Sequence, residues 1–264
     1  MRFCSLGSGS GGNATLIEAS QGITSTRLLV DAGFSARELV KRLARAGCAP
    51  EEIDAVFITH EHGDHIGCAL AFATRYRLPL ITSRGTWKAV GNADFDPAQL
   101  RIARDGEAIS LGDMELQPFT VPHDANEPLQ LVLSDGARRL GIVTDLGCAP
   151  DGVATALAGC QALLLECNHD EGLLRTGPYH PALKKRILGS HGHLSNAAAA
   201  DLLWRCRHAG LATVAAAHLS EHNNTPALAR AALTPILGCE ESDIRVAHPS
   251  LGLEWLALDG STPG

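Results

Sequence analysis

Short apolar runs alternate with helix-like segments along the whole chain. Runs rich in Leu, Ile and Val predict β-strands. In the first third of the chain they cover residues 13–19, 27–31, 55–59 and 78–82. Ser35 and Glu38 form a capping box, which predicts a helix that begins there and ends at Gly47. A second helix is predicted over residues 64–76.

The same alternation returns in the second half. Further strands are predicted over residues 114–121, 129–134, 138–144, 161–165, 213–217, 244–247 and 253–258. Asp135-Gly136 predicts a hairpin with a two-residue turn. Helices begin at Ser195 and at Thr225-Pro226, and we expect them to end near Gly210 and Gly238.

Strands and helices thus occur twice in the same order. This order predicts an α/β fold of two halves packed face to face, with the sheets inside and the helices outside. No linker rich in Pro, Ser or charge divides the chain. We therefore expect a single domain over residues 1–264.

Composition narrows the class of protein. The 264 residues are 45% hydrophobic and 19% charged, which is ordinary for a chain with a packed core. The net charge of −7 argues against a protein that coats nucleic acid. It does not exclude a nuclease, because a local site can be positive or metal-loaded while the whole molecule is acidic.

Location follows from three absences in the sequence. No segment approaches the roughly 18 consecutive apolar residues of a transmembrane helix. The N-terminus has no apolar region typical of a signal peptide. The eight cysteines are scattered without a Cys-x-x-Cys pair, which favours reduced thiols. We expect a cytoplasmic protein that does not contact membranes.

The strongest chemical signal is a cluster of metal-competent side chains directly after the run over residues 55–59. The sequence Thr59-His-Glu-His-Gly-Asp-His65 contains His60, His62, Asp64 and His65. His60 and His62 project to one side if the strand geometry continues, and Gly63 lets the backbone turn. Imidazole and carboxylate ligands suit zinc, manganese or iron. Surface histidines would rarely gather at this density without a metal.

Three more candidates follow apolar runs further along: His123, Asp145 and His218. Polar residues at strand ends are where α/β folds gather their sites. Taken singly, each fits a capped loop residue as well as a ligand. Together with the first cluster they complete two coordination sets.

A glycine-rich turn over residues 7–13 is compatible with two interpretations. Its backbone N–H groups could approach a phosphate, or it could form a tightly folded hairpin. It lacks the Gly-Lys-Ser/Thr ending of a P-loop.

These motifs resemble the metallo-β-lactamase-fold hydrolases and, within that superfamily, the YycJ/WalJ-like branch. The resemblance covers nearly the whole chain. It is carried by residues 5–13, 29–33, 59–65, 121–124, 144–147, 192–196 and 217–220. The His-x-His-x-Asp-His motif at His60 is specific for the superfamily, while the glycine turn and Gly-His-Leu-Ser-Asn at residues 192–196 indicate the branch.

The resemblance implies a four-layer αβ/βα sandwich with two divalent metal ions at one edge. It places one ion on His60, His62 and His123, and the other on Asp64, His65 and His218. It makes Asp145 the bridge between them and Asp31 an acceptor that orients the histidines. Cys148 is then not needed as a ligand.

Two metal ions would stabilise a bridging hydroxide that attacks phosphorus. The leaving group needs a proton, and His193 is the candidate acid, oriented by Glu166. This pair resembles the Glu/His pair of the phosphodiesterase relatives. Alternatively, His193 only packs beside the helix cap at Ser195. The expected catalytic group is therefore Asp64, His193, Glu166 and Asp31.

Other polar residues in this region remain ambiguous. Asn223 and Asn224 could contact phosphate or sugar, but Asn and Ser also cap helices and loops. The basic segment Lys184-Lys185-Arg186, with Arg175 nearby, could guide a polynucleotide backbone or form a solvated helix face. His169, His180 and His191 could equally be solvated loop residues.

The leading hypothesis is a metal-dependent phosphodiesterase, a DNA exonuclease that acts on DNA ends. One alternative keeps the site but takes a small substrate, such as a cyclic phosphodiester, a thioester, a lactam or another ester. Asp145 and the Glu166/His193 pair favour phosphodiesters, whereas the acidic net charge favours a small substrate. The other alternative, a metal-loaded scaffold without activity, is disfavoured by the intact ligand set.

Overall fold

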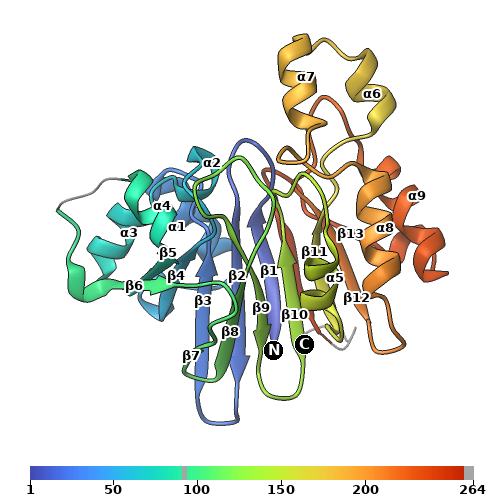
Figure 1. Ribbon diagram of the computed structural model, residues 1–264. Helices are drawn as coiled ribbons and strands as arrows, with labels where there is room; N and C mark the ends of the chain where they lie inside the picture. Colours follow the sequence, from blue (N-terminus) through green and yellow to red (C-terminus); the bar gives the residue numbers. More distant parts are fainter. Residues whose placement is uncertain (91–93, 259–264) are drawn as a thin grey trace.

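Two mixed β-sheets lie face to face, with helices on their outer sides (Figure 1). This architecture comes from a computed structural model, which describes residues 1–90 and 94–258. The layers confirm the predicted αβ/βα sandwich. Among the described residues, no helix has both the length and the apolar character needed to cross a membrane.

The first sheet contains seven strands in the order β14-β1-β2-β3-β4-β5-β6. Their bounds are Arg2–Gly7 for β1, Ala14–Ser20 for β2, Ser25–Val30 for β3, Ala55–Ile58 for β4, Leu80–Ser83 for β5, Leu100–Ala103 for β6 and Leu253–Ala257 for β14. Strands β14 to β3 pair antiparallel, and β3 to β6 pair parallel.

The second sheet also contains seven strands, in the order β13-β12-β11-β10-β9-β8-β7. Their bounds are Ile109–Leu111 for β7, Met114–Thr120 for β8, Leu129–Ser134 for β9, Arg139–Val143 for β10, Ala162–Glu166 for β11, Thr213–Ala217 for β12 and Arg245–Val246 for β13. Strands β10 to β13 are parallel. The meander β7 to β10 is antiparallel.

Helices cover the outer face of each sheet. The first sheet carries α1 (Ala36–Arg45), α3 (Ala69–Tyr76) and α4 (Arg84–Val90), while the short helix α2 (Gly63–Ile66) lies at the strand ends (Figure 1). The second carries α5 (Asp151–Leu157), α8 (Asn196–Cys206) and α9 (Pro226–Leu237). Two more helices, α6 (Glu171–Thr176) and α7 (Pro181–Ile187), project beyond the strand ends (Figure 1). Short 3₁₀ turns occur at Pro50–Glu52, Pro97–Gln99 and Glu241–Asp243.

The central core lies between the two sheets. It joins Phe3 and Phe57 of the first sheet to Leu131, Ile142 and Leu164 of the second, all at most 2% exposed. Two further apolar clusters lie between each sheet and its helices. Burial of this apolar surface is the main favourable term in folding. It also fixes the ends of strands from both sheets relative to one another.

Most predicted strands are confirmed within one or two residues, but the helix predicted over residues 64–76 is wrong. It is broken into α2 and α3 at Gly67, whose φ is +33°. The hairpin between β9 and β10 is confirmed, but its loop spans four residues, Asp135 to Arg138, rather than two. No range was predicted from the sequence for α4 to α7, β1, β6 and β7, which are all seven residues long or shorter.

Candidate metal centre

The predicted site residues come together at one edge of the sandwich. His60 follows β4, and Asp64 and His65 lie in α2. From the other sheet, His123 follows β8, Asp145 follows β10 and His218 follows β12. Strands β8, β10 and β12 run in the same direction, so their carboxyl ends meet at one edge.

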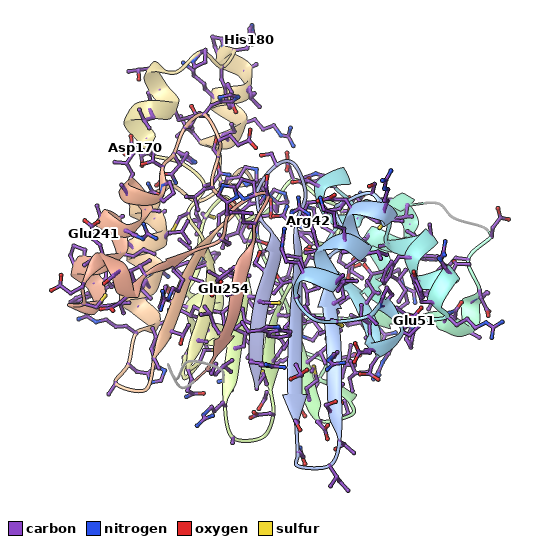
Figure 2. The ribbon with its side chains drawn as sticks, turned by 180° about the vertical axis from the view of Figure 1, so that it is seen from behind. Arg42, Glu51, Asp170, His180, Glu241 and Glu254 are labelled. Carbon is purple, nitrogen blue, oxygen red and sulfur yellow. The ribbon has the colours of Figure 1, made fainter. Side chains whose placement is uncertain are left out.

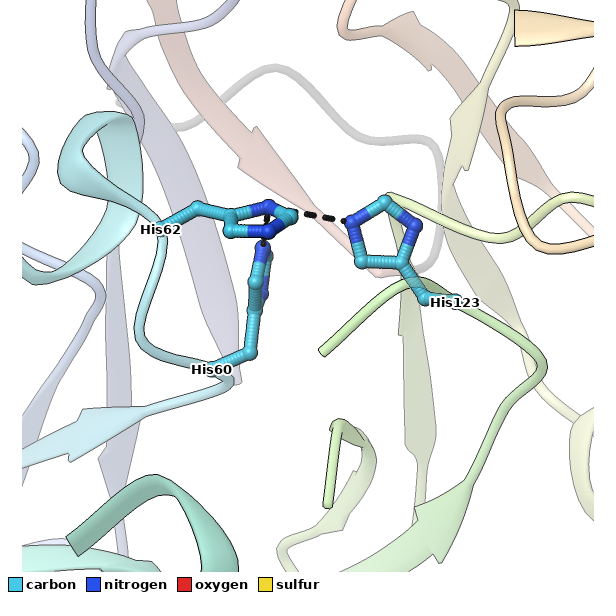
Figure 3. A group of neighbouring side chains, drawn as sticks. All are labelled: His60, His62 and His123. Atoms are coloured by element: carbon cyan, nitrogen blue, oxygen red, sulfur yellow. Dashed lines mark hydrogen bonds between the residues drawn. The ribbon is translucent and has the colours of Figure 1, made fainter. Parts of the chain in front are cut away.

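His60, His62 and His123 form the first group of candidate ligands, called here the first ligand group (Figure 3). Nε2 of His60 lies 3.0 Å from Nδ1 of His62, and Nε2 of His123 lies 3.2 Å from the same nitrogen. Ligands held 2.0–2.1 Å from a tetrahedral zinc ion would be about 3.3 Å apart. Nδ1 of His62 therefore lies at ligand spacing from both other nitrogens, and the ligand atoms of the three residues all lie within 4.8 Å of one another.

Asp64, His65 and His218 form the second group. Oδ2 of Asp64 lies 3.7 Å from Nε2 of His65 and 3.5 Å from Nε2 of His218. Both imidazoles are at most 2% exposed, whereas the Asp64 side chain is 25% exposed. The group is thus open to solvent on the aspartate side.

Asp145 lies between the two groups. Its Oδ2 is 2.9 Å from Nε2 of His65, and its Oδ1 is 3.6 Å from Nε2 of His218 and 4.0 Å from Nε2 of His123. Although Oδ2 is buried, it receives no hydrogen bond of acceptable geometry. A buried carboxylate oxygen without a donor is costly unless a cation satisfies it.

The outer nitrogens of the histidines are held by acceptors, which turns their inner nitrogens toward the site. Nδ1 of His65 contacts Oδ2 of Asp31 at 2.7 Å, and Nδ1 of His218 contacts Oε1 of Glu166 at 3.1 Å. For His123 and His60 the partners of Nδ1 are the Gly192 carbonyl at 3.1 Å and the Thr59 hydroxyl at 3.0 Å. Metal-binding histidines almost always have such partners.

The charge of the site favours cations. Asp31, Asp145 and Glu166 are at most 4% exposed, and Asp64 adds a fourth carboxylate. None of the four pairs with a lysine or arginine within residues 1–90 and 94–258. Burial alone would lower the pKa of His65, but Asp145 and Asp31 outweigh it and raise this pKa well above its ordinary value. The carboxylates thus attract positive charge, which divalent ions would provide.

In the first ligand group, two histidines have pKa values that are lowered, whereas the pKa of His65 is raised. Burial lowers the pKa of His60 well below its ordinary value, and the neighbouring His65 lowers it further. Burial also lowers the pKa of His123. Both imidazoles are therefore neutral near pH 7, which is the form that binds metal ions.

His193 lies beside these groups, on Glu166. Its Nδ1 is 2.8 Å from Oε1 of Glu166, and its ring stacks on that of His218 at a centroid distance of 5.2 Å. Oε2 of Glu166 accepts from the backbone N–H groups of Leu146 and Leu194 at 3.0 and 3.1 Å. Burial would raise the pKa of Glu166, but the charge and hydrogen bond of His193 outweigh it and hold this pKa at about 2.

The backbone at the site is unusual in a way that the sequence did not reveal. Asp31, Asp145 and His218 have φ values of +61°, +57° and +54°. Residues other than glycine rarely adopt this left-handed region, which costs of order 1–3 kcal/mol for each residue. Asp31 and His218 directly follow β3 and β12, and Asp145 lies two residues after the end of β10, so each left-handed turn redirects the chain at the site edge.

The glycine-rich turn over residues 7–13 is a hairpin between β1 and β2, as the second interpretation proposed. Its polar side chains nevertheless support the site. The Ser8 hydroxyl accepts from the backbone N–H of His218 at 2.8 Å. Nδ2 of Asn13 lies 3.3 Å from Oδ2 of Asp64 and 3.1 Å from Nε2 of His65. The sequence analysis did not assign these two residues to the site.

Asp124 is a further residue that the sequence analysis did not assign to the site. Its Oδ1 lies 3.4 Å from Nε2 of His123 and 3.9 Å from Nε2 of His62, and its Oδ2 pairs with Arg186 on α7. The signals in the sequence were its position directly after His123 and its place in the motif over residues 121–124.

Several polar residues of uncertain role make contacts within the fold. Ser195 caps α8, and Asn196 and Asn224 exchange hydrogen bonds in the interior. His180 caps α7, His191 is exposed and His169 is 1% exposed.

Comparison with known proteins agrees with this geometry. The profile of the metallo-beta-lactamase superfamily matches residues 7–209. The chain is 34% identical to exodeoxyribonuclease WalJ of Streptococcus pneumoniae serotype 2, over 98% of this chain and 94% of that protein. It is also 34% identical to exodeoxyribonuclease YycJ of Bacillus anthracis, over 90% of this chain and 89% of that protein.

Solved structures share the fold at low sequence identity. The metallo-beta-lactamase fold protein YhfI of Bacillus subtilis superposes with a TM-score of 0.72 at 16% identity, covering 95% of this chain and 97% of that one. The short form of human tRNase Z has a TM-score of 0.65 at 16% identity, with 98% and 99% coverage. At these identities the similarity is one of fold.

Proposed function

The chain belongs to the metallo-beta-lactamase superfamily, and from that premise we propose that it is a dinuclear-metal-dependent phosphodiesterase that shortens DNA from its ends. One observation carries the proposal: six metal-competent side chains converge in two groups around Asp145, with the His193–Glu166 pair beside them. The choice of DNA is supported by the full-length similarity to two proteins named exodeoxyribonucleases.

We assign one divalent cation to the group of His60, His62 and His123, and a second to that of Asp64, His65 and His218, with Asp145 shared by both. When bound, the two cations would lower the pKa of water and stabilise the charge that develops on the phosphate. Zinc, manganese and iron all accept these nitrogen and oxygen ligands, and we propose zinc or manganese first.

His193 is proposed as the proton donor to the leaving oxygen. Because its Nδ1 is bound to Glu166, the proton to be transferred would be held at Nε2. Burial lowers the pKa of His193, but the Glu166 carboxylate outweighs this and raises it. Its side chain is 22% exposed, so a substrate could reach it from solvent. General acids of this kind contribute about 10²–10⁴-fold to the rate.

Asp31 and Glu166 are proposed as positioning residues. Asp31 accepts from the backbone N–H and the hydroxyl of Thr59 and contacts Nδ1 of His65, which fixes the His65 ring. Glu166 contacts both His193 and His218. Glu166 would therefore fix the orientation of the proposed acid, His193, relative to the proposed ligand His218.

A cytoplasmic location and a single folding unit are also proposed. All eight cysteines, each within the described residues, are free, which supports a reducing compartment. The central core takes side chains from both sheets, which supports one domain over residues 1–264, although residues 91–93 and 259–264 lie outside the described residues.

The test is degradation of end-labelled DNA by protein loaded with Mn²⁺ or Zn²⁺. Single- and double-stranded DNA, RNA and bis(p-nitrophenyl) phosphate serve as substrates, with label at either end. Stepwise shortening of DNA is expected, and it should disappear in His65→Ala. His208→Ala is the matched control, because His208 is exposed just beyond the end of α8 and, among the described residues, its ring forms hydrogen bonds with the Cys160 carbonyl and the Gly210 N–H and with no site residue.

Each other outcome has a clear meaning. Turnover of the small diester without cleavage of DNA or RNA would refute the nuclease and favour a small phosphodiester as the substrate. Equal activity in His65→Ala and His208→Ala would refute the proposed metal centre.

A further inference from the structure

The helices α6 and α7 form an arm, residues 171–187, that stands beyond the strand ends on the side of the candidate site (Figure 1). Seen from behind in Figure 2, Asp170 lies at its base and His180 at its outer end. The arm carries Arg175, Lys184, Lys185 and Arg186 against the single carboxylate Glu171. Its net charge is +3, in a chain whose net charge is −7.

Lysine is rare in this protein, which makes the arm distinctive. The chain has four lysines, and two of them are adjacent on α7. Lysine binds phosphate as a compact charge on a flexible stem, and arrays of Lys and Arg supply the sequence-independent part of nucleic-acid affinity.

The three consecutive cations of α7 point in different directions, because neighbouring residues of a helix are about 100° apart. Lys184 donates to the Arg175 carbonyl of α6 at 2.8 Å, which ties the two helices together. Arg186 pairs with Asp124 at the edge of the site. Lys185 is exposed and has no ion pair within residues 1–90 and 94–258.

The arm is fixed to both ligand groups. On one side, Asp124 is 3.4 Å from Nε2 of His123, and its backbone N–H donates to the His191 carbonyl beyond α7. On the other side, the N–H of Asp170 donates to the Asn223 carbonyl at 2.8 Å, in the loop that follows His218. The ring of Tyr179, between α6 and α7, packs edge-on against the ring of His222 in that loop, with 5.8 Å between the ring centroids.

We propose that this arm binds the phosphate backbone of the nucleic-acid strand whose end enters the candidate metal centre, with Lys184 and Lys185 as its phosphate contacts. The inference rests on the proposed function and names the surface that would hold the polymer. The helix that carries both lysines also reaches the candidate site, because Arg186 on α7 pairs with Asp124, which lies beside the first ligand group. The net negative charge of the protein would repel an anionic polymer. The arm offsets this repulsion locally, because its positive charge is concentrated where the strand would lie.

The test compares binding and chemistry in Lys184→Gln/Lys185→Gln. Glutamine removes both charges and keeps a polar N–H group at each position. The matched control, Lys41→Gln/Arg245→Gln, removes two exposed cations from α1 and β13, outside the arm. Thermal midpoints of all variants verify that they fold.

Binding is measured by fluorescence anisotropy with a fluorescein-labelled single-stranded phosphorothioate oligonucleotide, which resists cleavage, between 50 and 250 mM KCl. Each lost phosphate contact lowers the slope of log Kd against log salt by about 0.7 for a single strand. We expect a fall of about 1.4 in the arm variant and no change in the control. Hydrolysis of bis(p-nitrophenyl) phosphate, which is too small to reach the arm, should stay at the wild-type rate in both variants.

An unchanged slope in a folded arm variant would overturn the proposal, as would an equal fall in the control. Failure of the wild-type protein to hydrolyse bis(p-nitrophenyl) phosphate would instead count against the metal-dependent function, because hydrolysis of this small diester does not depend on the arm.

Discussion

His193 is the residue at which geometry gives the sharpest mechanistic expectation. Because Glu166 holds its Nδ1, the ring has one nitrogen left for the substrate. We expect His193→Ala to lower kcat on DNA by about 10²–10⁴-fold, since the sugar oxygen must leave with a proton. On bis(p-nitrophenyl) phosphate the loss should be much smaller, because nitrophenolate leaves without one. Steady-state kinetics on both substrates make the comparison.

The contrast between leaving groups is what separates acid catalysis from a structural role. A His193 that only packed beside α8 would, when removed, reduce turnover of both substrates by the same factor. His191→Ala is the control, because His191 is exposed and two residues away.

Asp145 is the residue on which the two proposed metal positions depend. Its carboxylate faces His65, His218 and His123, and one of its oxygens has no donor. We expect Asp145→Asn to reduce the metal content from two ions per chain to one or fewer, as measured by inductively coupled plasma mass spectrometry after dialysis. Asp201→Asn, on the surface of α8, should retain two. Unchanged metal content in Asp145→Asn would refute the bridge.

Among individual residues, the sequence predicts the candidate metal ligands better than the residues and backbone conformations that hold them in place. The His60 to His65 cluster is visible because four candidates lie within six positions. Ser8 and Asn13 reach the site from a turn that is distant in sequence, and the positive φ of Asp31, Asp145 and His218 leaves no trace in composition. Such contacts depend on tertiary structure, which spacing along the chain does not encode.

At the scale of elements, the break between α2 and α3 has a direct steric cause. A Cβ at Gly67 would lie 2.4 Å from the Ala32 carbonyl oxygen, and φ there is +33°. We therefore expect Gly67→Ala to lower the free energy of unfolding by about 1–3 kcal/mol and to displace His65. Urea unfolding monitored by circular dichroism measures the first effect, and metal content measures the second.

Gly63 supplies the comparison within the same short helix. Apart from its chain neighbours and its own helix backbone, no atom of the described residues lies within 4 Å of a Cβ built there, and its φ is not positive. Gly63→Ala should therefore leave stability within about 0.5 kcal/mol of wild type, because alanine also favours the helix. Equal destabilisation by the two substitutions would contradict the steric explanation.

The elements that the sequence revealed are those with strong periodicity or clear caps. Buried strands such as β4 and β12 are continuous apolar runs, and α1, α8 and α9 begin at Ser or Thr caps. The missed helices α5, α6 and α7 have six or seven residues, too few for a helical period to stand out. The predicted helix over residues 64–76 was wrong because its apolar pattern continues through Gly67, where tertiary packing requires a break.

At the scale of the molecule, the proposed centre joins the two halves of the sandwich. His60, His62, Asp64 and His65 come from the side of the first sheet, and His123, Asp145 and His218 from that of the second. Without cations, the buried carboxylates must be satisfied by protons on the neighbouring imidazoles, as the raised pKa of His65 indicates. Bound metal would therefore stabilise the contact between the sheets as well as the site.

Metal removal should consequently destabilise the whole protein. A ligand at 100 times its Kd stabilises the folded state by about 2.7 kcal/mol. In a chain of this size, each kcal/mol shifts the thermal midpoint by about 2–4 °C. We expect chelation with EDTA to lower the midpoint by about 5–10 °C in differential scanning calorimetry, and re-addition of Mn²⁺ or Zn²⁺ to restore it.

The shape of the transition tests the single folding unit at the same time. Because the central core and the proposed ligands both span the two sheets, the chelated and the loaded protein should each unfold in one transition. Asp145→Asn should begin with a lower midpoint and respond less to EDTA, while Asp201→Asn should behave as wild type. Two separate transitions, only one of them sensitive to metal, would show instead that the halves fold independently and that the metals stabilise one alone.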